Sequence, residues 1–286
     1  MTPPYAPPDI EGELIAMGVS SHRVVADGLD THYLEIGQGP TLLLVHGGGA
    51  GADSWGNWKG CLHAYARNFR VIAPDMPGFG RTAKPAPADY DYSQPSRNRH
   101  MLAFMDALGL DSAHLIGNSM GGATALGVAM QQPERVDKLV LMGSAGLGIS
   151  NQDPTYMKAF SGYDYTKEAM RRLMQNLGGS RYQIDESLLM YRHSLMQEPA
   201  AQAAIDVIRR SHLVYEREQI AAVKTPTLVV GGKDDKIAVL ARTYGYLELM
   251  DNSWGFVLPH VGHWAMMESP REFVAITTAF FSNDMF

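Results

Sequence analysis

The sequence contains a single cysteine, Cys61, among its 286 residues. One thiol cannot form an internal disulfide, so a disulfide-stapled fold is excluded and a reducing compartment, the cytoplasm, is expected. No apolar run approaches the roughly 20 residues that cross a bilayer, so no membrane partner is expected. The opening stretch, MTPPYAPPDIEGE, lacks the basic start and apolar core of a secretory signal, and its prolines favour an extended arm.

Basic residues are also scarce. The chain has 24 Lys and Arg against 30 Asp and Glu, a formal net charge of −6. This balance argues against a general binder of nucleic acids or anionic membranes. Apolar residues make up 45% of the chain and charged residues only 19%, which is typical of a globular protein with a substantial core.

Short apolar runs alternate with helical segments along most of the chain. Residues 41–45 form a continuous apolar run of the kind found in strands buried on both faces, and residues 96–108 have helical spacing. This alternation predicts an α/β fold with a mostly parallel central sheet and helices on both faces. The other predicted strands are 70–73, 138–142, 227–231 and 254–258, with a hairpin of 21–25 and 31–35 before them.

The alternation stops between about residues 147 and 216, where segments such as 166–177 and 198–210 have helical character. An insertion directly after a strand lies over the carboxyl ends of the sheet, where such folds bind ligands. We therefore interpret it as a helical lid; an insertion that only packs its own small core is the alternative. The predicted organisation is a core formed by residues 1–146, with an arm to about residue 20, and by residues 217–286, with the lid 147–216 between them.

The strongest motif is Gly117-Asn118-Ser119-Met120-Gly121, which follows the apolar pair Leu115-Ile116. The order predicts a buried strand, a very tight turn and a helix. Glycines flank the turn because side chains there would collide with the neighbouring backbone. Ser119 at the apex would be held in a strained conformation with its hydroxyl exposed above the sheet edge, the pattern of a nucleophile elbow.

A serine hydroxyl is a weak nucleophile and needs a base and a group that orients the base. The strand at 227–231 leads into Asp234-Asp235, of which Asp235 is our choice of acid and Asp234 the alternate. His263 follows a glycine in the loop after the last strand and is preferred to His260 as the base. The order Ser, Asp, His is that of the α/β-hydrolase fold. Cys61 is not favoured as a nucleophile because Ser119 is the better candidate.

The glycine-rich turn His46-Gly47-Gly48-Gly49 follows another buried strand. Such a turn can aim backbone N–H groups at one point, so the N–H groups of Gly48 and Met120 are predicted to form an oxyanion hole. A phosphate-binding turn is the rival interpretation, but no Walker lysine follows. This chemistry requires no metal and no cofactor.

Taken together, these motifs resemble those of the meta-cleavage product hydrolases, carbon–carbon bond hydrolases of bacterial aromatic degradation. The resemblance runs from about Ser21 to Phe280 and includes Asn118 inside the elbow and Trp264 after the histidine. It implies an α/β-hydrolase with a helical lid, assembled as a homodimer or a higher even-numbered oligomer. It also implies a 2-hydroxy-6-oxo-hexa-2,4-dienoate substrate, ketonised and then cleaved between C5 and C6 by attack of the serine.

The resemblance further implies a polar end of the substrate pocket. Arg192 matches the position that binds the C1 carboxylate and C2 oxygen, a task suited to its two-pronged donor geometry; a solvated lid arginine is the alternative. The chain departs from the family pattern at two positions. Val239 stands where many relatives have proline, and Ala50 stands where some relatives have proline. The remaining substrate-binding positions implied are Gly47, Gly49, Asn57, Asn118 and Trp264.

Two other functions fit some of these features. A carboxylesterase would use the same triad but has no need of a carboxylate clamp at Arg192, and a small-molecule receptor would keep the fold with a nearly idle triad. A haloalkane dehalogenase would need an aspartate at position 119, where this chain has serine.

Overall fold

The computed structural model describes residues 10–153, 155–156 and 162–282. Their centre is one eight-stranded sheet. Its strands are β1 (Ser20–Ala26), β2 (Leu29–Ile36), β3 (Thr41–Val45), β4 (Arg70–Pro74), β5 (Ala113–Asn118), β6 (Val136–Met142), β7 (Thr227–Gly232) and β8 (Ser253–Leu258). The spatial order is β1-β2-β4-β3-β5-β6-β7-β8; β1, β2 and β4 pair antiparallel, and all neighbours from β4 to β8 are parallel.

The strands predicted from apolar runs are confirmed. The central strands carry residues such as Leu43, Ile116 and Leu141 that are fully buried, because helices cover both sides of a parallel sheet. The hairpin between β1 and β2 turns at Asp27 and Gly28, which both have positive φ, 48° and 75°. Two successive positive φ angles match the right-handed strand twist of a two-residue hairpin.

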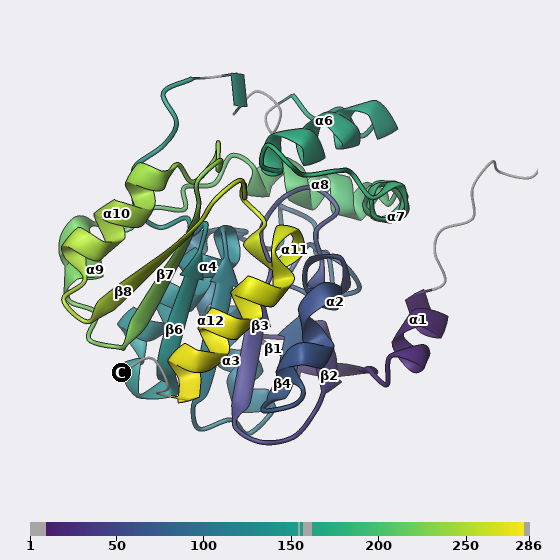
Figure 1. Ribbon diagram of the computed structural model, residues 1–286. Coiled ribbons are helices and arrows are strands. Elements are labelled where there is room, and N and C mark those ends of the chain that lie inside the picture. The colour runs from purple at the N-terminus through teal and green to yellow at the C-terminus, as the bar shows by residue number, and fades with distance from the viewer. Residues whose placement is uncertain (1–9, 154, 157–161, 283–286) are drawn as a thin grey trace, which may run out of the picture.

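The core helices lie in two layers. The helices α2 (Ser54–Tyr65), α11 (Ala265–Glu268) and α12 (Pro270–Ser282) pack together on one face, whereas α3 (Gln94–Ala107) and α4 (Met120–Gln131) pack together on the other (Figure 1). The helix α10 (Leu240–Leu249) packs against β7 and β8, and a short 3-10 turn, η1 (Pro133–Arg135), precedes β6. Among the residues that the structure describes, no helix has both the length and the apolar character needed for a bilayer crossing.

The chain around the predicted arm differs from a simple extended tail. The proline-rich residues 1–9 lie outside the described residues, but Ile10–Ala16 form a helix, α1. Ile10 and Leu14, four residues apart, share one helix face and are buried, while acidic side chains occupy the first turn. This helix is not predicted from the sequence, because only two apolar residues mark its buried face.

Helices also fill the insertion between β6 and β7. They are α6 (Lys167–Leu177), α7 (Glu186–Leu195), α8 (Pro199–Ile208) and α9 (Arg217–Ala221). The predicted helical segments 166–177 and 198–210 correspond to α6 and α8. Figure 1 shows α6, α7 and α8 above the carboxyl ends of the parallel strands. Gly146 and Val214 form an isolated parallel bridge, so the chain leaves and re-enters the sheet layer at one place.

The parallel topology decides where the site forms. Because β3, β5, β7 and β8 run in one direction, the loops that follow them meet at a single edge of the sheet. These loops carry the glycine turn, the elbow, Asp235 and His263, and the insertion covers the same edge. Residues far apart in the sequence are thereby gathered under the insertion.

Candidate active site

Ser119 lies at the apex of a tight turn between β5 and α4. Its φ and ψ are 53° and −116°, a conformation that costs a non-glycine residue about 1–3 kcal/mol. The surrounding backbone holds it there: Ser119 N–H donates to the Met142 carbonyl at 3.1 Å, and the Ser119 carbonyl accepts from Ala145 at 2.9 Å. The strain is imposed by the fold, as expected for a nucleophile elbow.

The flanking glycines are required by close backbone contacts. A Cβ atom on Gly117 would lie 2.4 Å from the Gly121 carbonyl oxygen, and one on Gly121 would lie 2.3 Å from the Val45 carbonyl oxygen. Neither space admits a methyl group without movement of the main chain. The helix that starts at Met120 can therefore approach β3 and β5 only with glycine at both positions.

Gly117→Ala is expected to lower the free energy of unfolding by about 1–3 kcal/mol or more, because the added methyl group overpacks rigid backbone. Urea denaturation measures the loss. Gly60→Ala is the matched control: Gly60 lies in α2, and an added Cβ would meet its nearest neighbours at 3.8 and 4.0 Å. There alanine should be neutral or stabilising by up to about 1 kcal/mol. Equal stabilities of the two variants would contradict the packing described here.

The carboxylate that meets His263 belongs to Asp235. His263 Nδ1 lies 2.8 Å from Asp235 Oδ2, and the other carboxylate oxygen accepts N–H groups of Ile237 and Ala238 at 2.8 and 2.9 Å. Burial by itself would raise the pKa of Asp235, but His263 and these hydrogen bonds outweigh it and hold the pKa below its usual value. The pair is arranged to keep an anion beside the imidazole.

The two alternates lie elsewhere. Asp234 accepts a hydrogen bond from the N–H of Ser180 at 3.0 Å, and His260 is exposed. The valine at position 239, where many relatives have proline, leaves the turn after Asp235 closed by its two backbone hydrogen bonds. The register of the acid loop is thus set by main-chain bonding to Asp235.

The glycine turn lies directly against the elbow. A Cβ atom on Gly47 would lie 2.8 Å from Asn118 Oδ1 and 3.4 Å from Ser119 Cβ, and one on Gly48 would lie 2.8 Å from Met120 Sδ. Side chains on this turn would displace the elbow. The backbone N–H groups of Gly48 and Met120, the predicted oxyanion donors, thus belong to segments in contact.

His46 fixes the orientation of this turn and was not recognised from the sequence. The N–H of Met76 donates to His46 Nε2 at 2.9 Å, so the ring proton is on Nδ1, which donates to the Gly47 carbonyl at 2.7 Å. Burial lowers the pKa of His46 and keeps the ring neutral. The Gly47 carbonyl and the Gly48 N–H point in opposite directions from one planar peptide, so His46 also sets the direction of that donor.

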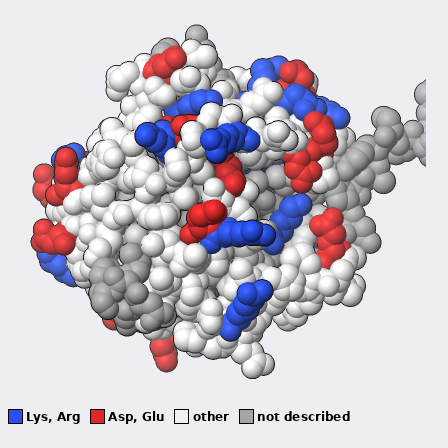
Figure 2. Space-filling view, viewed as in Figure 1, with Lys and Arg blue, Asp and Glu red and all other residues white. Residues whose placement is uncertain are grey.

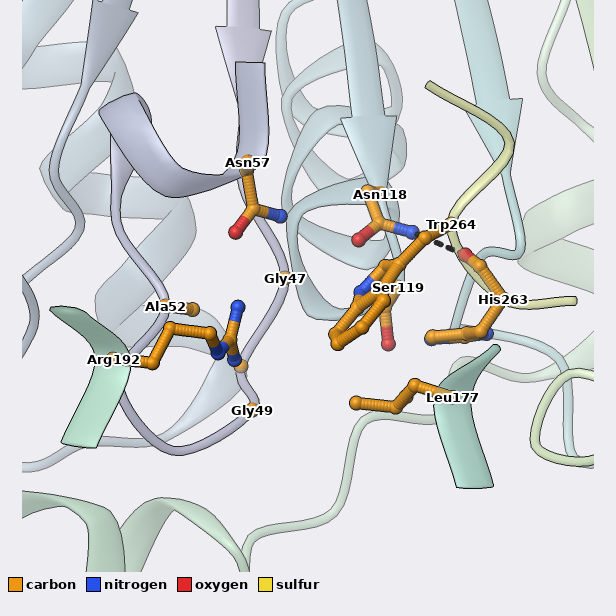
Figure 3. A pocket seen from close by; sticks show the side chains of 11 residues that line it. Gly47, Gly49, Ala52, Asn57, Asn118, Ser119, Leu177, Arg192, His263 and Trp264 are labelled. Carbon is orange, nitrogen blue, oxygen red and sulfur yellow. Dashed lines mark hydrogen bonds between the residues drawn. The ribbon is translucent and has the colours of Figure 1, made fainter. Parts of the chain in front are cut away.

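These segments line a small cavity (Figure 3). Nine of the predicted site residues line it. The other two are Met120, which follows Ser119 in the sequence, and Asp235, which contacts His263. Ala52 and Leu177 also line it and were not predicted, because only the folded chain brings them to this edge. The lining residues are Gly47, Gly48, Gly49, Ala52, Asn57, Asn118, Ser119, Leu177, Arg192, His263 and Trp264.

Arg192 forms one end of the cavity and is not a solvated lid residue: its exposed fraction is 1%. Nη2 donates to the Ala50 carbonyl at 2.8 Å, and the guanidinium lies over the Trp264 ring, 5.1 Å from its centroid. The Nε and Nη1 atoms are buried and have no hydrogen-bond partner. Proline is not needed at position 50 for this contact, since the Ala50 carbonyl accepts it.

No carboxylate neutralises this cation among the described residues. On the face shown in Figure 2, Lys and Arg side chains lie among Asp and Glu side chains, and pairs such as Arg171–Glu186 form on the lid. Arg192 has no such ion pair. The carboxyl group with the largest effect on the pKa of Arg192 is that of Asp53, whose own pKa is raised to about 7 by burial and by the charge of Asp75. A buried, unpaired cation costs several kcal/mol, so the cavity is prepared for an anion.

Two amide oxygens reinforce the polarity of this region. Asn57 Oδ1 and Asn118 Oδ1 are buried without hydrogen-bond partners, and in Figure 3 both amides lie beside the cavity, Asn57 on the side of Arg192 and Asn118 on the side of Ser119. Asn118 Nδ2 is held by the carbonyl oxygens of Met142 and His263, at 3.2 and 3.3 Å. Buried polar atoms are normally satisfied, so unpartnered ones gathered around a cavity indicate a polar ligand.

The lid helix α7 holds Arg192 against the core. The Tyr191 hydroxyl donates to buried Asp53, and the backbone of Arg192 passes so close to Gly51 that a Cβ there would lie 2.3 Å from its carbonyl oxygen. Gly51 has a φ of 67°, which also favours glycine. Two contacts at or next to Arg192 in sequence therefore fix its position over the cavity.

Two other potential nucleophiles lie outside this cavity. Cys61 is buried, burial raises the pKa of its thiol to about 12, and its Sγ donates to the Met266 carbonyl at 3.2 Å. Ser21 is exposed on β1 and lies 2.9 Å from His32 Nε2, while His32 Nδ1 lies 2.8 Å from Asp75. The second set repeats the Ser–His–Asp bonding pattern outside the cavity that Ser119 lines, and its aspartate also accepts the backbone N–H groups of Ser54 and Arg81.

Comparisons with known proteins agree with this fold. A family model described as the alpha/beta hydrolase fold matches residues 40–270, so the chain is an α/β-hydrolase. The 2-hydroxy-6-oxo-6-(2'-aminophenyl)hexa-2,4-dienoic acid hydrolase of Metapseudomonas resinovorans is 44% identical over 265 residues, which cover 91% of this chain and 90% of that protein. The 2-hydroxy-6-oxo-2,4-heptadienoate hydrolase of Pseudomonas putida is 32% identical, with coverages of 90% and 94%. The chain belongs to the meta-cleavage product hydrolases.

A solved structure supports the same assignment. The crystal structure of a serine hydrolase involved in carbazole degradation, the CarC enzyme, superposes with a TM-score of 0.85 at 42% sequence identity. The match covers 92% of this chain and 99% of that one. The fold and the family predicted from the sequence are thereby confirmed.

Proposed function

We propose that this protein hydrolyses the C5–C6 bond of a 2-hydroxy-6-oxo-hexa-2,4-dienoate that carries an aryl group on C6. The products are 2-hydroxypenta-2,4-dienoate and a carboxylic acid. The observation that carries the proposal is the buried guanidinium of Arg192, with two unpartnered nitrogens at one end of the cavity and Ser119 in its lining. A carboxylate at one end and a ketone at the serine are what a dienoate presents.

The chemistry needs this separation of roles. A carbon–carbon bond breaks heterolytically only if the leaving carbon can delocalise its electron pair. Ketonisation moves the C2 hydroxyl proton to C5 and creates a C2 carbonyl conjugated through C3 and C4. Arg192 and the amide nitrogen of Asn57 would hold the carboxylate and the C2 oxygen, where negative charge collects in the dienolate, while Asn118, whose nitrogen is bound by two carbonyls, would accept the C2 hydroxyl of the dienol on its oxygen.

Ser119 would then attack the C6 carbonyl while His263 accepts its proton. The N–H groups of Gly48 and Met120 would stabilise the oxyanion. Collapse of the tetrahedral intermediate breaks the C5–C6 bond, sends the electron pair to the C2 oxygen and leaves an acyl group on Ser119; the proton held by His263 passes to the leaving dienolate, which departs as the 2-hydroxydienoate and leaves His263 neutral. Water, activated by His263, would release the carboxylic acid and restore the serine.

The decisive experiment is Arg192→Ala, measured on a dienoate and on a neutral ester. Loss of a charged donor from a buried site should cost roughly 2–5 kcal/mol, about 30-fold to several thousand-fold in kcat/KM for the dienoate. A contact that strengthens along the reaction lowers kcat as well as raising KM. Arg192→Lys keeps the charge but loses the fork, so recovery should be partial.

A neutral ester lacks the carboxylate, so its hydrolysis should barely change in Arg192→Ala. Arg172→Ala is the matched control, because Arg172 is an exposed lid arginine whose loss should leave both rates near wild type. An unchanged ratio of the two rates in Arg192→Ala would place the carboxylate clamp elsewhere and favour a carboxylesterase. A wild-type protein that binds the yellow dienolate without bleaching it would be a receptor.

Four finer points complete the proposal. The aryl group on C6 is supported by the name of the 44% identical relative, whereas the 32% identical one is named for a heptadienoate. Steady-state kinetics on dienoates with phenyl, aminophenyl and methyl groups would rank the substituents.

A cytoplasmic location is supported by the single cysteine. An even-numbered homo-oligomer and the division into core 1–146, lid 147–216 and core 217–286 remain proposals.

A further inference from the structure

Glu268 makes an unusual set of contacts around the loop that carries His263. It ends α11, five positions after the histidine, and its carboxylate turns back toward the loop. One oxygen accepts the N–H groups of Gly262 at 3.0 Å and Trp264 at 3.3 Å, the residues on either side of His263. The other oxygen accepts the N–H of Gly179 at 2.8 Å.

Gly179 belongs to the lid, directly after α6. In the same lid segment, the Leu177 carbonyl accepts the backbone N–H of His263 at 2.7 Å. The N–H groups of residues 262, 263 and 264 are thus all bound, two by Glu268 and one by the lid. Leu177 also lines the cavity, so this junction borders the reacting region.

The junction is packed backbone against backbone. A Cβ atom on Gly179 would lie 2.4 Å from the His260 carbonyl oxygen and 2.6 Å from the Gly262 nitrogen. A Cβ on Gly262 would lie 2.4 Å from the Gly179 nitrogen. Only glycine at both positions lets the segments approach closely enough for one carboxylate to bridge them.

Glu268 is not an ordinary surface acid. It is partly buried and has no Lys or Arg ion pair among the described residues, so its bonding capacity is used on the three N–H groups. Hydrogen bonds to an ionised carboxylate are shorter and stronger than those between neutral groups. The residue does not line the cavity, so it acts through the loop that it holds.

We propose that Glu268 is a positioning residue that couples the seating of the lid to the placement of the His263 imidazole. The inference rests on the proposed function, in which His263 moves the protons. With the lid seated, the Leu177 carbonyl and Glu268 fix the main chain on both sides of the histidine. With the lid displaced, Gly179 leaves the carboxylate and His263 loses the carbonyl that binds its N–H.

Glu268→Gln is the first test, since it keeps the shape but loses the charge and turns an NH2 group toward a backbone donor. kcat for the dienoate should fall about 10- to 100-fold, the scale expected for a misplaced catalytic group. KM should stay within about twofold, because Arg192 and the asparagines are untouched. Glu272→Gln is the matched control: Glu272 is exposed on α12, and its loss should change neither constant.

Gly179→Ala tests the same link from the lid side without altering Glu268 or His263. It should reproduce the fall in kcat, and the double variant should lose less than the product of the two single losses, because both break one junction. Hydrogen exchange should quicken in both single variants at residues 177–180 and 260–264 and stay unchanged in the central strands.

Wild-type kcat in Glu268→Gln would overturn the inference. So would a loss of kcat accompanied by faster exchange across the whole sheet, since that would report general destabilisation. Failure of the wild-type protein to cleave any dienoate would instead refute the proposed function. In that case the exchange pattern, together with neutral-ester hydrolysis in the same variants, still decides whether Glu268 couples the lid to His263.

Discussion

Ser119→Ala is expected to lower kcat for dienoate cleavage by about 10⁴- to 10⁶-fold, the scale seen when a serine nucleophile is removed. The substitution deletes the atom that attacks C6 and leaves the binding groups in place. Binding should therefore survive, because Arg192 and the two asparagines remain unchanged. Absorbance of the dienolate measures both properties: its shift on binding persists while its bleaching stops.

Ser21→Ala provides the matched control for this experiment. Ser21 has a histidine and an aspartate in the same bonding order as a catalytic serine, but it is exposed on β1 and outside the cavity. Its loss should leave kcat near wild type. Substantial turnover by Ser119→Ala would mean that the elbow serine is not the nucleophile, and a large loss in Ser21→Ala would transfer attention to the second set.

Asp235→Asn is expected to lower kcat by up to about 10⁴-fold, the effect of presenting the wrong imidazole tautomer to the serine. The aspartate accepts from His263 Nδ1 at 2.8 Å, so an amide NH2 in its place would favour the other tautomer. The two backbone N–H groups still find an acceptor oxygen, so folding should be retained. Circular dichroism measures whether the fold is retained, and stopped-flow kinetics measure the loss of kcat.

Asp234→Asn is the control that the sequence itself offers one position away. Its carboxylate accepts the N–H of the lid residue Ser180 and does not contact His263, so turnover should change by no more than a few-fold. A larger loss in Asp234→Asn than in Asp235→Asn would reverse the choice of acid. His263→Ala should slow both ketonisation and acylation, because one imidazole serves both proton transfers.

Local sequence rules determined much of this protein. Apolar runs specify strands buried on both faces, and Gly117 and Gly121 specify a turn in which no larger residue fits at either position. The order of Ser119, Asp235 and His263 along parallel strands also placed their loops at one edge of the sheet. These features follow from short-range sterics and hydrophobic patterning, which are written within a few residues.

The tertiary structure decided what depends on burial and on partners distant in sequence. The sequence favours Asp235 over its neighbour Asp234, and the position of His263, 28 residues away, separates the roles of the two. The sequence also favours Arg192 as a carboxylate-binding residue over a solvated lid arginine, and burial beside Ala50, 142 residues away, makes it an unpaired cation. The link from Glu268 to Gly179 joins positions 89 residues apart. Such contacts depend on how the sheet and helix layers pack. A local sequence pattern does not show the electrostatic cost of a charge, because that cost arises only when folding removes water from the charged group.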